Sequence, residues 1–319
     1  MKMKANKAGF IRLTLPVVLI IAVTATVYAQ DPVLPATNLG LANIFDGKAG
    51  KPGVVYQGFV QAFQTHALYD QKGNRTTSDL KVNSVLLMNQ FLTVTPVKVL
   101  NGNLCFTILV PIVQVNTSNV NGPAPAASPS ALGDPIFGAA IQWSDRKLFQ
   151  KPFSHRLEFD VSTAWGNYDS RYAINPSAHL WTYITYYAFT ITLNKQLSVS
   201  SRNELNYNSH IIDAKDKPGA FYNGNYSVEY SILPAIKLEA VAYYLQQINQ
   251  DSYGGDHHYY QDHFGISNTK EKVLGLGPGL AYFTPHGVFF ETKVFFETDA
   301  KNRFAGTRTS LRVTIPLSK

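Results

Sequence analysis

The chain has 319 residues and a formal net charge of +7 at pH 7, and only 15% of its residues are charged, against about 25% in a typical soluble domain. Four of its 28 basic residues and none of its 21 acidic residues lie in the first 30 positions, so the remainder carries 28 minus 4, or 24, basic residues and a net charge of +3. This small excess gives no indication of a nucleic-acid surface, and the single cysteine, Cys105, excludes an internal disulfide.

Residues 1–29 have the composition of a secretory signal peptide. A basic start with Lys2 and Lys4 precedes an apolar stretch over 13–27, which ends in the small-residue pattern before Ala29. The apolar stretch of about 15 residues is shorter than the roughly 20 that a membrane-spanning helix needs. We predict export with cleavage after Ala29, followed by an irregular lead-in over 30–52 that is rich in Pro, Asn and Gly.

Strands with alternating apolar and polar side chains follow from residue 53 onwards. In HRLEFDVST, for example, Leu157 and Phe159 alternate with Glu158 and Asp160, which is the period of a β-strand. Most candidates reach or exceed the roughly 9 to 11 residues that a tilted strand needs to cross a bilayer. We predict twelve strands, at 53–66, 81–94, 102–115, 133–144, 153–166, 179–193, 196–208, 219–232, 235–248, 271–283, 287–297 and 305–317.

The connections between these strands alternate in length. The long ones are 67–80, 116–132, 167–178, 209–218, 249–270 and 298–306, the short ones are 194–195, 233–234 and 284–286, and 95–101 and 145–152 are intermediate. Outer-membrane barrels have short periplasmic turns and long external loops. We therefore predict an all-β, antiparallel up-and-down transmembrane β-barrel of about twelve strands over 53–319, in the bacterial outer membrane, with both termini periplasmic. A secreted soluble sandwich shares the two-faced strands but does not account for the alternating loops.

In such a barrel the polar face of each strand lines the lumen. Charges of both signs recur on it, which predicts cross-strand pairing around a polar interior. The lumen-lining candidates are Arg156, Glu158, Asp160, Arg202, Glu204, Glu229, Lys237, Glu239, Glu291, Lys293, Arg308 and Arg312. Aromatic residues that could form interfacial girdles are Trp181, Tyr183, Tyr186, Tyr187, Tyr207, Tyr230, Tyr243 and Tyr244.

Several short motifs occur in the order found in one known family. Leu132-Gly133-Asp134-Pro135 opens a strand, Trp165-Gly166-Asn167-Tyr168-Asp169 ends one, Asn175-Pro176 lies in the next loop, and Glu204-Leu205-Asn206-Tyr207-Asn208, Gly277-Pro278 and Lys301-Asn302-Arg303 follow. On these residues the chain resembles, over about 37–317, the family named for the meta-pathway of phenol degradation, which consists of predicted outer-membrane barrel transporters. The resemblance implies a role in uptake of phenol-like compounds and brings no catalytic residues. Two departures are Trp165, where the family pattern differs, and a C-terminus without the aromatic residue typical of the assembly signal.

The densest group of metal-ligating residue types lies in the longest loop, at Asp256, His257, His258, Asp262 and His263. Imidazoles and carboxylates bind borderline metals, but neighbouring loop residues define no coordination geometry, so an exposed polar loop is the favoured interpretation. The sequence has no Gly-x-Ser-x-Gly elbow. We expect no cofactor and no enzyme activity.

Together these patterns predict a channel for passive uptake of small molecules, with aromatic or hydrophobic compounds as the class that the resemblance suggests. The expected partners are outer-membrane lipid, a small-molecule solute and the outer-membrane assembly machinery, and not nucleic acid. The alternative is a non-transporting structural or surface-binding barrel with a plugged lumen. Twelve strands leave this alternative open, because the count lies between small filled barrels and wide porins.

Overall fold

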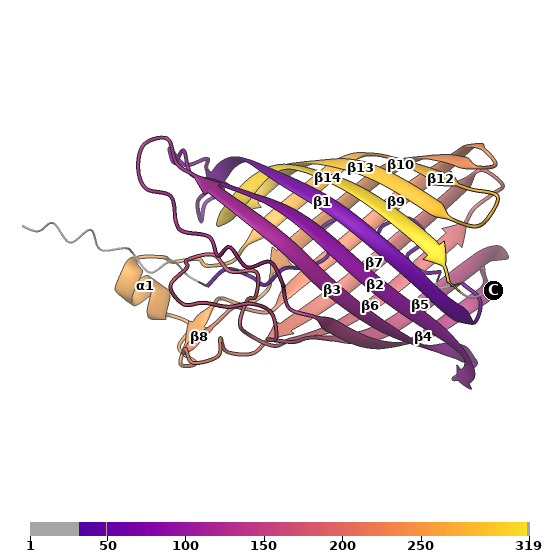
Figure 1. Cartoon of the computed structure of the whole chain (residues 1–319), viewed down its shortest axis with the longest axis horizontal. Coiled ribbons are helices and arrows are strands. Elements are labelled where there is room, and N and C mark those ends of the chain that lie inside the picture. Colours follow the sequence, from indigo (N-terminus) through magenta and orange to yellow (C-terminus); the bar gives the residue numbers. More distant parts are fainter. Residues whose placement is uncertain (1–31, 49, 318–319) are drawn as a thin grey trace, which may run out of the picture. The chain divides into compact units, whose positions relative to one another are not determined.

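The computed structural model describes residues 32–48 and 50–317, and residues 53–316 form a closed antiparallel barrel (Figure 1). The predicted signal peptide lies outside the described residues. The twelve barrel strands are β1 (Gly53–Tyr69), β2 (Lys81–Val99), β3 (Gly102–Ser118), β4 (Ile136–Leu148), β5 (Lys151–Ser162), β6 (Thr182–Thr192), β7 (Leu197–Asn208), β9 (Phe221–Leu233), β10 (Ile236–Gln247), β12 (Lys272–Phe283), β13 (Phe289–Lys301) and β14 (Arg303–Pro316). Each pairs with its neighbour along the chain, and β14 closes the barrel against β1. The predicted fold class is therefore confirmed.

Three short elements lie in the long loops at one end of the barrel. These are β8 (Asp216–Lys217), β11 (Ser252–Tyr253), which pairs with β8, and the six-residue helix α1 (Tyr259–Phe264). The sequence interpretation did not include this helix. Within the described part of the chain, no helix has the length and apolar character of a membrane span.

The outer surface of the barrel is apolar and the inner surface is polar. In β5, Leu157 and Phe159 are 46% and 49% exposed, whereas Glu158 and Asp160 are 2% and 4% exposed. A soluble sandwich would bury the apolar set instead, and a membrane barrel exposes it to lipid. Tyr186 and Tyr243 are corrections to the predicted girdles, because both side chains are buried inside the barrel.

Several predicted connections are shorter in the structure. The turns after β2 and β4 contain only Leu100-Asn101 and Phe149-Gln150, and all four residues have positive φ, as tight hairpin turns of type I′ require. Leu100 and Phe149, the first residues of the two turns, are not residue types that favour positive φ, so the turns appear longer in the sequence than they are in the structure. The long connection predicted at 298–306 is wrong. Thr298 and Lys301 still pair with β12, and Asn302 alone joins β13 to β14.

The lead-in runs through the barrel. The Leu34 amide donates to Glu271 Oε1 at 3.0 Å, just before β12 and at the end with the long loops. The Gly47 amide donates to Thr190 Oγ1 at 3.3 Å, near the short turn after β6. We call residues 32–48 the lumenal segment. Figure 1 places the C-terminus at the short-turn end, where the Leu317 amide donates to the Val54 carbonyl at 2.8 Å. The first and last described residues thus lie at opposite ends of the barrel, and the prediction that both termini are periplasmic stays a prediction because the N-terminal residues lie outside the described part of the chain.

Candidate functional site in the barrel lumen

Side chains of the wall satisfy the backbone of the lumenal segment. Asn223 and Asn225 of β9 both donate to the Asn38 carbonyl at 2.7 Å, and Asn225 also accepts from the Gly40 amide at 2.8 Å. In the other direction, Asn43 donates to the backbone carbonyls of Tyr226 and Ala242 at 3.1 Å. An irregular segment inside a barrel needs such partners, because unpaired buried backbone groups cost free energy. The inward-facing asparagines supply them.

A buried lysine fixes the middle of the segment. Lys293 Nζ donates to the Leu41 carbonyl at 3.0 Å and to Asn43 Oδ1 at 2.9 Å, and it pairs with Glu291 at 2.9 Å. The side chains of Lys293 and Glu291 are fully buried. Apolar contacts add to this anchor, because Ile44 packs with Ala281 and Phe289 of the same region of the wall.

A network of ion pairs binds the C-terminal part of the lumenal segment, at Asp46. The Asp46 carboxylate lies 3.6 Å from Arg156 Nη2 and 3.5 Å from Arg202 Nη1. Each arginine has a closer carboxylate on its own strand, since Arg156 Nε is 3.0 Å from Glu158 and Arg202 Nε is 3.0 Å from Glu204. These four ion pairs are almost wholly shielded from solvent, so each partner compensates a charge that would otherwise be costly to bury.

Tyr186 links the two arginines of this network. Its hydroxyl accepts from Arg156 Nη2 at 2.5 Å and donates to Glu158. The Arg202 guanidinium lies 3.5 Å from the centre of its ring, a favourable cation–π distance. Asp46 is thereby docked onto a preformed polar surface of β5, β6 and β7.

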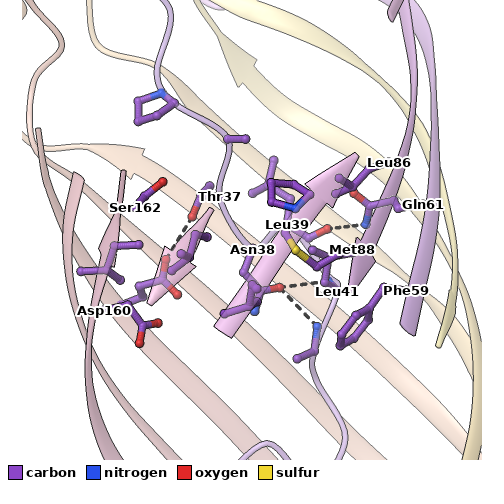
Figure 2. Close-up of a pocket in the computed structure, with 18 of the residues that line it drawn as sticks. Thr37, Asn38, Leu39, Leu41, Phe59, Gln61, Leu86, Met88, Asp160 and Ser162 are labelled. Carbon is purple, nitrogen blue, oxygen red and sulfur yellow. Dashed lines mark hydrogen bonds between the residues drawn. The ribbon is translucent and has the colours of Figure 1, made fainter. Parts of the chain in front are cut away.

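A cavity of about 310 Å³ remains between the lumenal segment and the part of the barrel wall formed by β14 and β1–β7. Figure 2 shows its two unlike walls, with Asp160 and Ser162 on one side and Leu86 and Met88 on the other. Thr37 and Leu39 of the segment lie between them and belong to both kinds of surface. The apolar wall also includes Leu109, Pro111 and Val113 of β3. The cavity is therefore amphipathic, and it falls at the lower end of the usual size range for small-molecule sites.

At the long-loop end, a half-buried carboxylate joins two loops beside this cavity. Asp134 accepts from the Gly166 amide at 2.9 Å, the Ser177 hydroxyl at 2.6 Å and the Ala178 amide at 2.8 Å. Burial raises the pKa of Asp134, although the three hydrogen bonds oppose that shift. The residues of two family motifs thus meet at the mouth of the cavity and fix its rim.

All twelve predicted lumen residues have side chains on the inner face of their strands, and the structure divides them into two groups. Those that line the cavity are Arg156, Glu158, Asp160, Arg202, Glu204, Arg308 and Arg312. The remaining five lie on the part of the wall that faces the lumenal segment and do not line the cavity. They are Glu229, Lys237, Glu239, Glu291 and Lys293. A role in solute passage stays a prediction for both groups.

The sequence interpretation missed the apolar wall and the lumenal segment. A signal for the wall was present, because β2 and β3 are apolar on both faces over stretches such as VLLM and FTILVPIV. A continuous apolar run is typical of a strand buried on both sides. The segment itself has no periodicity that could place it inside the barrel.

The histidine-rich stretch includes the helix α1, which contains His263, and the residues directly before it, His257 and His258. His257 Nδ1 lies 3.2 Å from the Gln250 carbonyl, and His263 Nδ1 lies 2.9 Å from the Tyr259 carbonyl, with the two rings of Tyr259 and His263 stacked at 4.2 Å. Over residues 32–48 and 50–317, no group of three His, Cys, Asp or Glu side chains is arranged to hold a metal ion. The histidines have local structural contacts instead.

The fold and this lumen define an outer-membrane type of β-barrel. The family model described as putative MetA-pathway of phenol degradation matches residues 65–313, so the chain belongs to that family. No curated protein matches the chain in sequence. Among solved structures, an outer membrane channel from Pseudomonas putida F1 superposes with a TM-score of 0.72 at 15% identity, covering 86% of this chain and 98% of the channel. At this identity the similarity establishes the fold.

Two further solved structures are less similar in geometry. A Pseudomonas aeruginosa FadL homologue has a TM-score of 0.43 at 10% identity, covering 91% of this chain and all of the homologue, or 100%. The CymD monoaromatic hydrocarbon channel has a TM-score of 0.44 at 10% identity, covering 84% of this chain and 90% of the other.

Proposed function

We propose that the protein is a passive channel of the bacterial outer membrane for small molecules that combine an apolar body with a polar group. The observation that carries the proposal is the amphipathic cavity beside the lumenal segment, with Leu86 and Met88 facing Asp160 and Ser162. The end with the long loops faces outwards and the C-terminus lies on the periplasmic side. Solute enters between the loops that Asp134 joins and moves down its own gradient.

The apolar wall favours aromatic and other hydrophobic solutes over sugars. Burial of apolar surface yields about 25 cal/mol per Å², so a ring that buries roughly 100 Å² gains about 2.5 kcal/mol. A sugar gains little from this wall and loses hydrogen bonds to water. The apolar wall therefore selects among solutes. Apart from the solute, the expected partners are the outer-membrane assembly machinery and lipid.

The ionisable groups of the lumen support a channel more than an enzyme. The carboxylates Glu158 and Glu204 pair with arginines on their own strands at 3.0 Å. An acid–base pair for catalysis instead needs groups that can exchange protons with a substrate. Paired charges that line a passage fix its shape and potential.

A second candidate is a non-transporting barrel, and the lumenal segment is the observation that favours it. This segment fills one side of the lumen through buried contacts such as those of Lys293. If the remaining cavity does not connect both ends, the protein serves as a closed surface element. Solute flux separates the two candidates.

The test is flux of benzyl alcohol and of arabinose into liposomes that contain the purified barrel. We expect benzyl alcohol to exceed its rate in protein-free liposomes, and arabinose to enter far more slowly. Met88→Gln places a polar group on the apolar wall and should lower benzyl alcohol flux several-fold. Val273→Thr is the control, because Val273 is also a buried inward side chain but lies outside the cavity lining. Equal rates with and without protein would contradict the channel.

A further inference from the structure

One carboxylate on the cavity wall, Asp160, lacks the arginine partner that its neighbours have, although its side chain contacts Glu158. Asp160 lines the cavity and is only 4% exposed, and its Oδ1 has no hydrogen-bond partner among the described residues. Within the same part of the chain, no basic side chain lies within ion-pair distance of it, whereas Glu158 and Glu204 each have an arginine at 3.0 Å. A buried carboxylate without a counter-charge is costly.

The charges around Asp160 leave an excess of negative charge. Two guanidinium groups, of Arg156 and Arg202, face four carboxylates, and both guanidinium groups are already engaged. The four carboxylates are Asp46, Glu158, Asp160 and Glu204. With every group ionised, this patch has a charge of two minus four, or −2. The cavity lining as a whole has six acidic and six basic residues, so the excess is confined to this patch, which attracts a cation locally.

The backbone makes room for Asp160 at this position. Asp160 pairs in register with Gly138 of β4, and a Cβ atom on Gly138 would come within 1.8 Å of Oδ1. Ser162 is the next inward residue of β5, and Thr37 of the segment lies nearby on the same wall. Hydroxyl groups at these positions can accept further hydrogen bonds from a ligand. Opposite them lies the apolar wall.

We propose that Asp160 is the anchor of a binding site for small organic amines, in which the ammonium group pairs with the carboxylate and the apolar body lies against Leu86 and Met88. This assignment rests on the proposed channel function and names the solute class of the same cavity. A primary ammonium has three donors, which suit Asp160, Ser162 and Thr37 together. It also supplies the counter-charge that the patch lacks.

A neutral alcohol and a carboxylic acid fit the site less well. An alcohol can donate one hydrogen bond but leaves the net charge of the patch unchanged. A carboxylate adds a further negative charge beside Asp160 and is repelled. The amine site thus predicts an order of affinity among solutes of one shape, with benzylamine first, benzyl alcohol second and benzoate last.

Calorimetric titration of the detergent-solubilised full-length barrel with these three ligands tests the site without requiring transport. We expect Asp160→Asn to weaken benzylamine binding about tenfold, as loss of one charge-assisted hydrogen bond implies, and to weaken benzyl alcohol binding much less, because the side-chain carbonyl of the introduced asparagine can still accept the hydrogen bond of a neutral alcohol. Glu239→Gln is the matched control. Glu239 is also a buried inward carboxylate with unpartnered oxygens, but it does not line the cavity.

The outcomes separate the site from the channel. Benzylamine that binds no better than benzyl alcohol, or a loss of affinity that is equal in Asp160→Asn and Glu239→Gln, overturns the amine site. Benzyl alcohol binding checks that Asp160→Asn retains a folded cavity. Tight amine binding to a barrel that gives no liposome flux supports the amine site and refutes the channel. Alcohol flux without a preference for amine binding supports the channel and refutes the amine site.

Discussion

The two sides of the lumen have the same strand architecture but different contents. Against β9, β10 and β13 the interior is filled by the lumenal segment, whose backbone is bonded to Asn223, Asn225 and Lys293. Against β2, β3 and β5 the interior keeps a cavity with one apolar and one polar wall. The filled side has amides and a lysine where the open side has Leu86 and Met88.

This difference shows how one chain can both narrow a wide barrel and shape its remaining passage. Polar inward residues recruit the segment, because its carbonyl and amide groups need partners. Apolar inward residues offer no such partners. Phe59 and Met88 instead pack against Leu41 of the segment, and the cavity lies beside this contact. The segment in turn presents Thr37 and Leu39 to the cavity. The selectivity of the open side thus depends on the occupant of the filled side.

Removing the lumenal segment should have the largest effect. Deletion of residues 32–48 takes away the contents of the filled side, so we expect single-channel conductance in planar bilayers to rise several-fold with a broader range of solutes. Deletion of 72–78 is the control, because those residues lie in the loop after β1 and mostly outside the barrel wall. Unchanged conductance after the first deletion would show that the segment does not limit the passage.

Loss of the buried lysine should strongly destabilise the filled side. Lys293→Met removes the closer of the two ion-pair partners of Glu291, leaving Arg312 at 3.5 Å, and removes two bonds to the segment. Breaking a buried ion pair from one side typically costs about 3–5 kcal/mol, so the free energy of unfolding in urea should fall by that amount.

The control for this change is an ion pair at a more exposed position. Lys272 lies 2.5 Å from Asp299, with side chains 23% and 47% exposed. Pairs of this kind contribute about 0–1 kcal/mol, so Lys272→Met should shift the unfolding midpoint little. A similar loss for both variants would mean that burial of Lys293 is not what makes its pair important.

On the open side, a single methyl group should disturb the polar wall. Gly138→Ala places a Cβ atom 1.8 Å from Asp160 Oδ1, so the carboxylate has to move. Overpacking of this kind costs about 1–3 kcal/mol, and we expect a lower unfolding free energy together with weaker benzylamine binding. Ala139→Gly is a suitable comparison, because Ala139 is the adjacent outward residue of β4. Unaltered amine affinity in Gly138→Ala would show that the position of Asp160 is not critical.

Much of the fold could be predicted because its signals are local. The alternation of Leu157 and Phe159 with Glu158 and Asp160 predicts both the strand and its inner face. In the structure the first two are exposed and the last two are buried. The tight turn at Leu100-Asn101 could not be placed in the same way. Asn101 favours positive φ, but Leu100 does not, and its positive φ follows from the pairing of the two strands.

The site was only half predictable for a different reason. The bonds of the lumenal segment join residues that are far apart in the chain, such as Leu41 and Lys293, which are 252 positions apart. No local pattern encodes such contacts. Asp160 was predicted to face the lumen, but its lack of a partner depends on where Arg156 and Arg202 direct their side chains. The sequence shows which residues are charged, whereas three-dimensional packing decides which carboxylate has no arginine within ion-pair distance.

The smallest effect is expected in the loop between β5 and β6, where the exposed ion pair of Arg171 and Asp169 titrates independently of the groups in the lumen. Arg171 binds Asp169 with a shortest contact of 2.6 Å and holds the pKa of Asp169 at about 2, below its ordinary value of 3.8. Because the folded-state pKa is lowered, the pair stabilises the loop above the ordinary pKa and loses this contribution as the pH falls towards 2.

Arg171→Ala should therefore raise the pKa of Asp169 towards its ordinary value, as measured by NMR titration of the Asp169 carboxyl carbon in detergent micelles. Both residues are solvent-accessible, so screening by water keeps the effect local and the global unfolding midpoint should not move. Asp134 is the internal control in the same titration, because its raised pKa comes from burial and should be the same in the variant. A concurrent shift of Asp134 would instead mean that the loop and the cavity mouth respond as one unit, and that the open side is sensitive to charge at its rim.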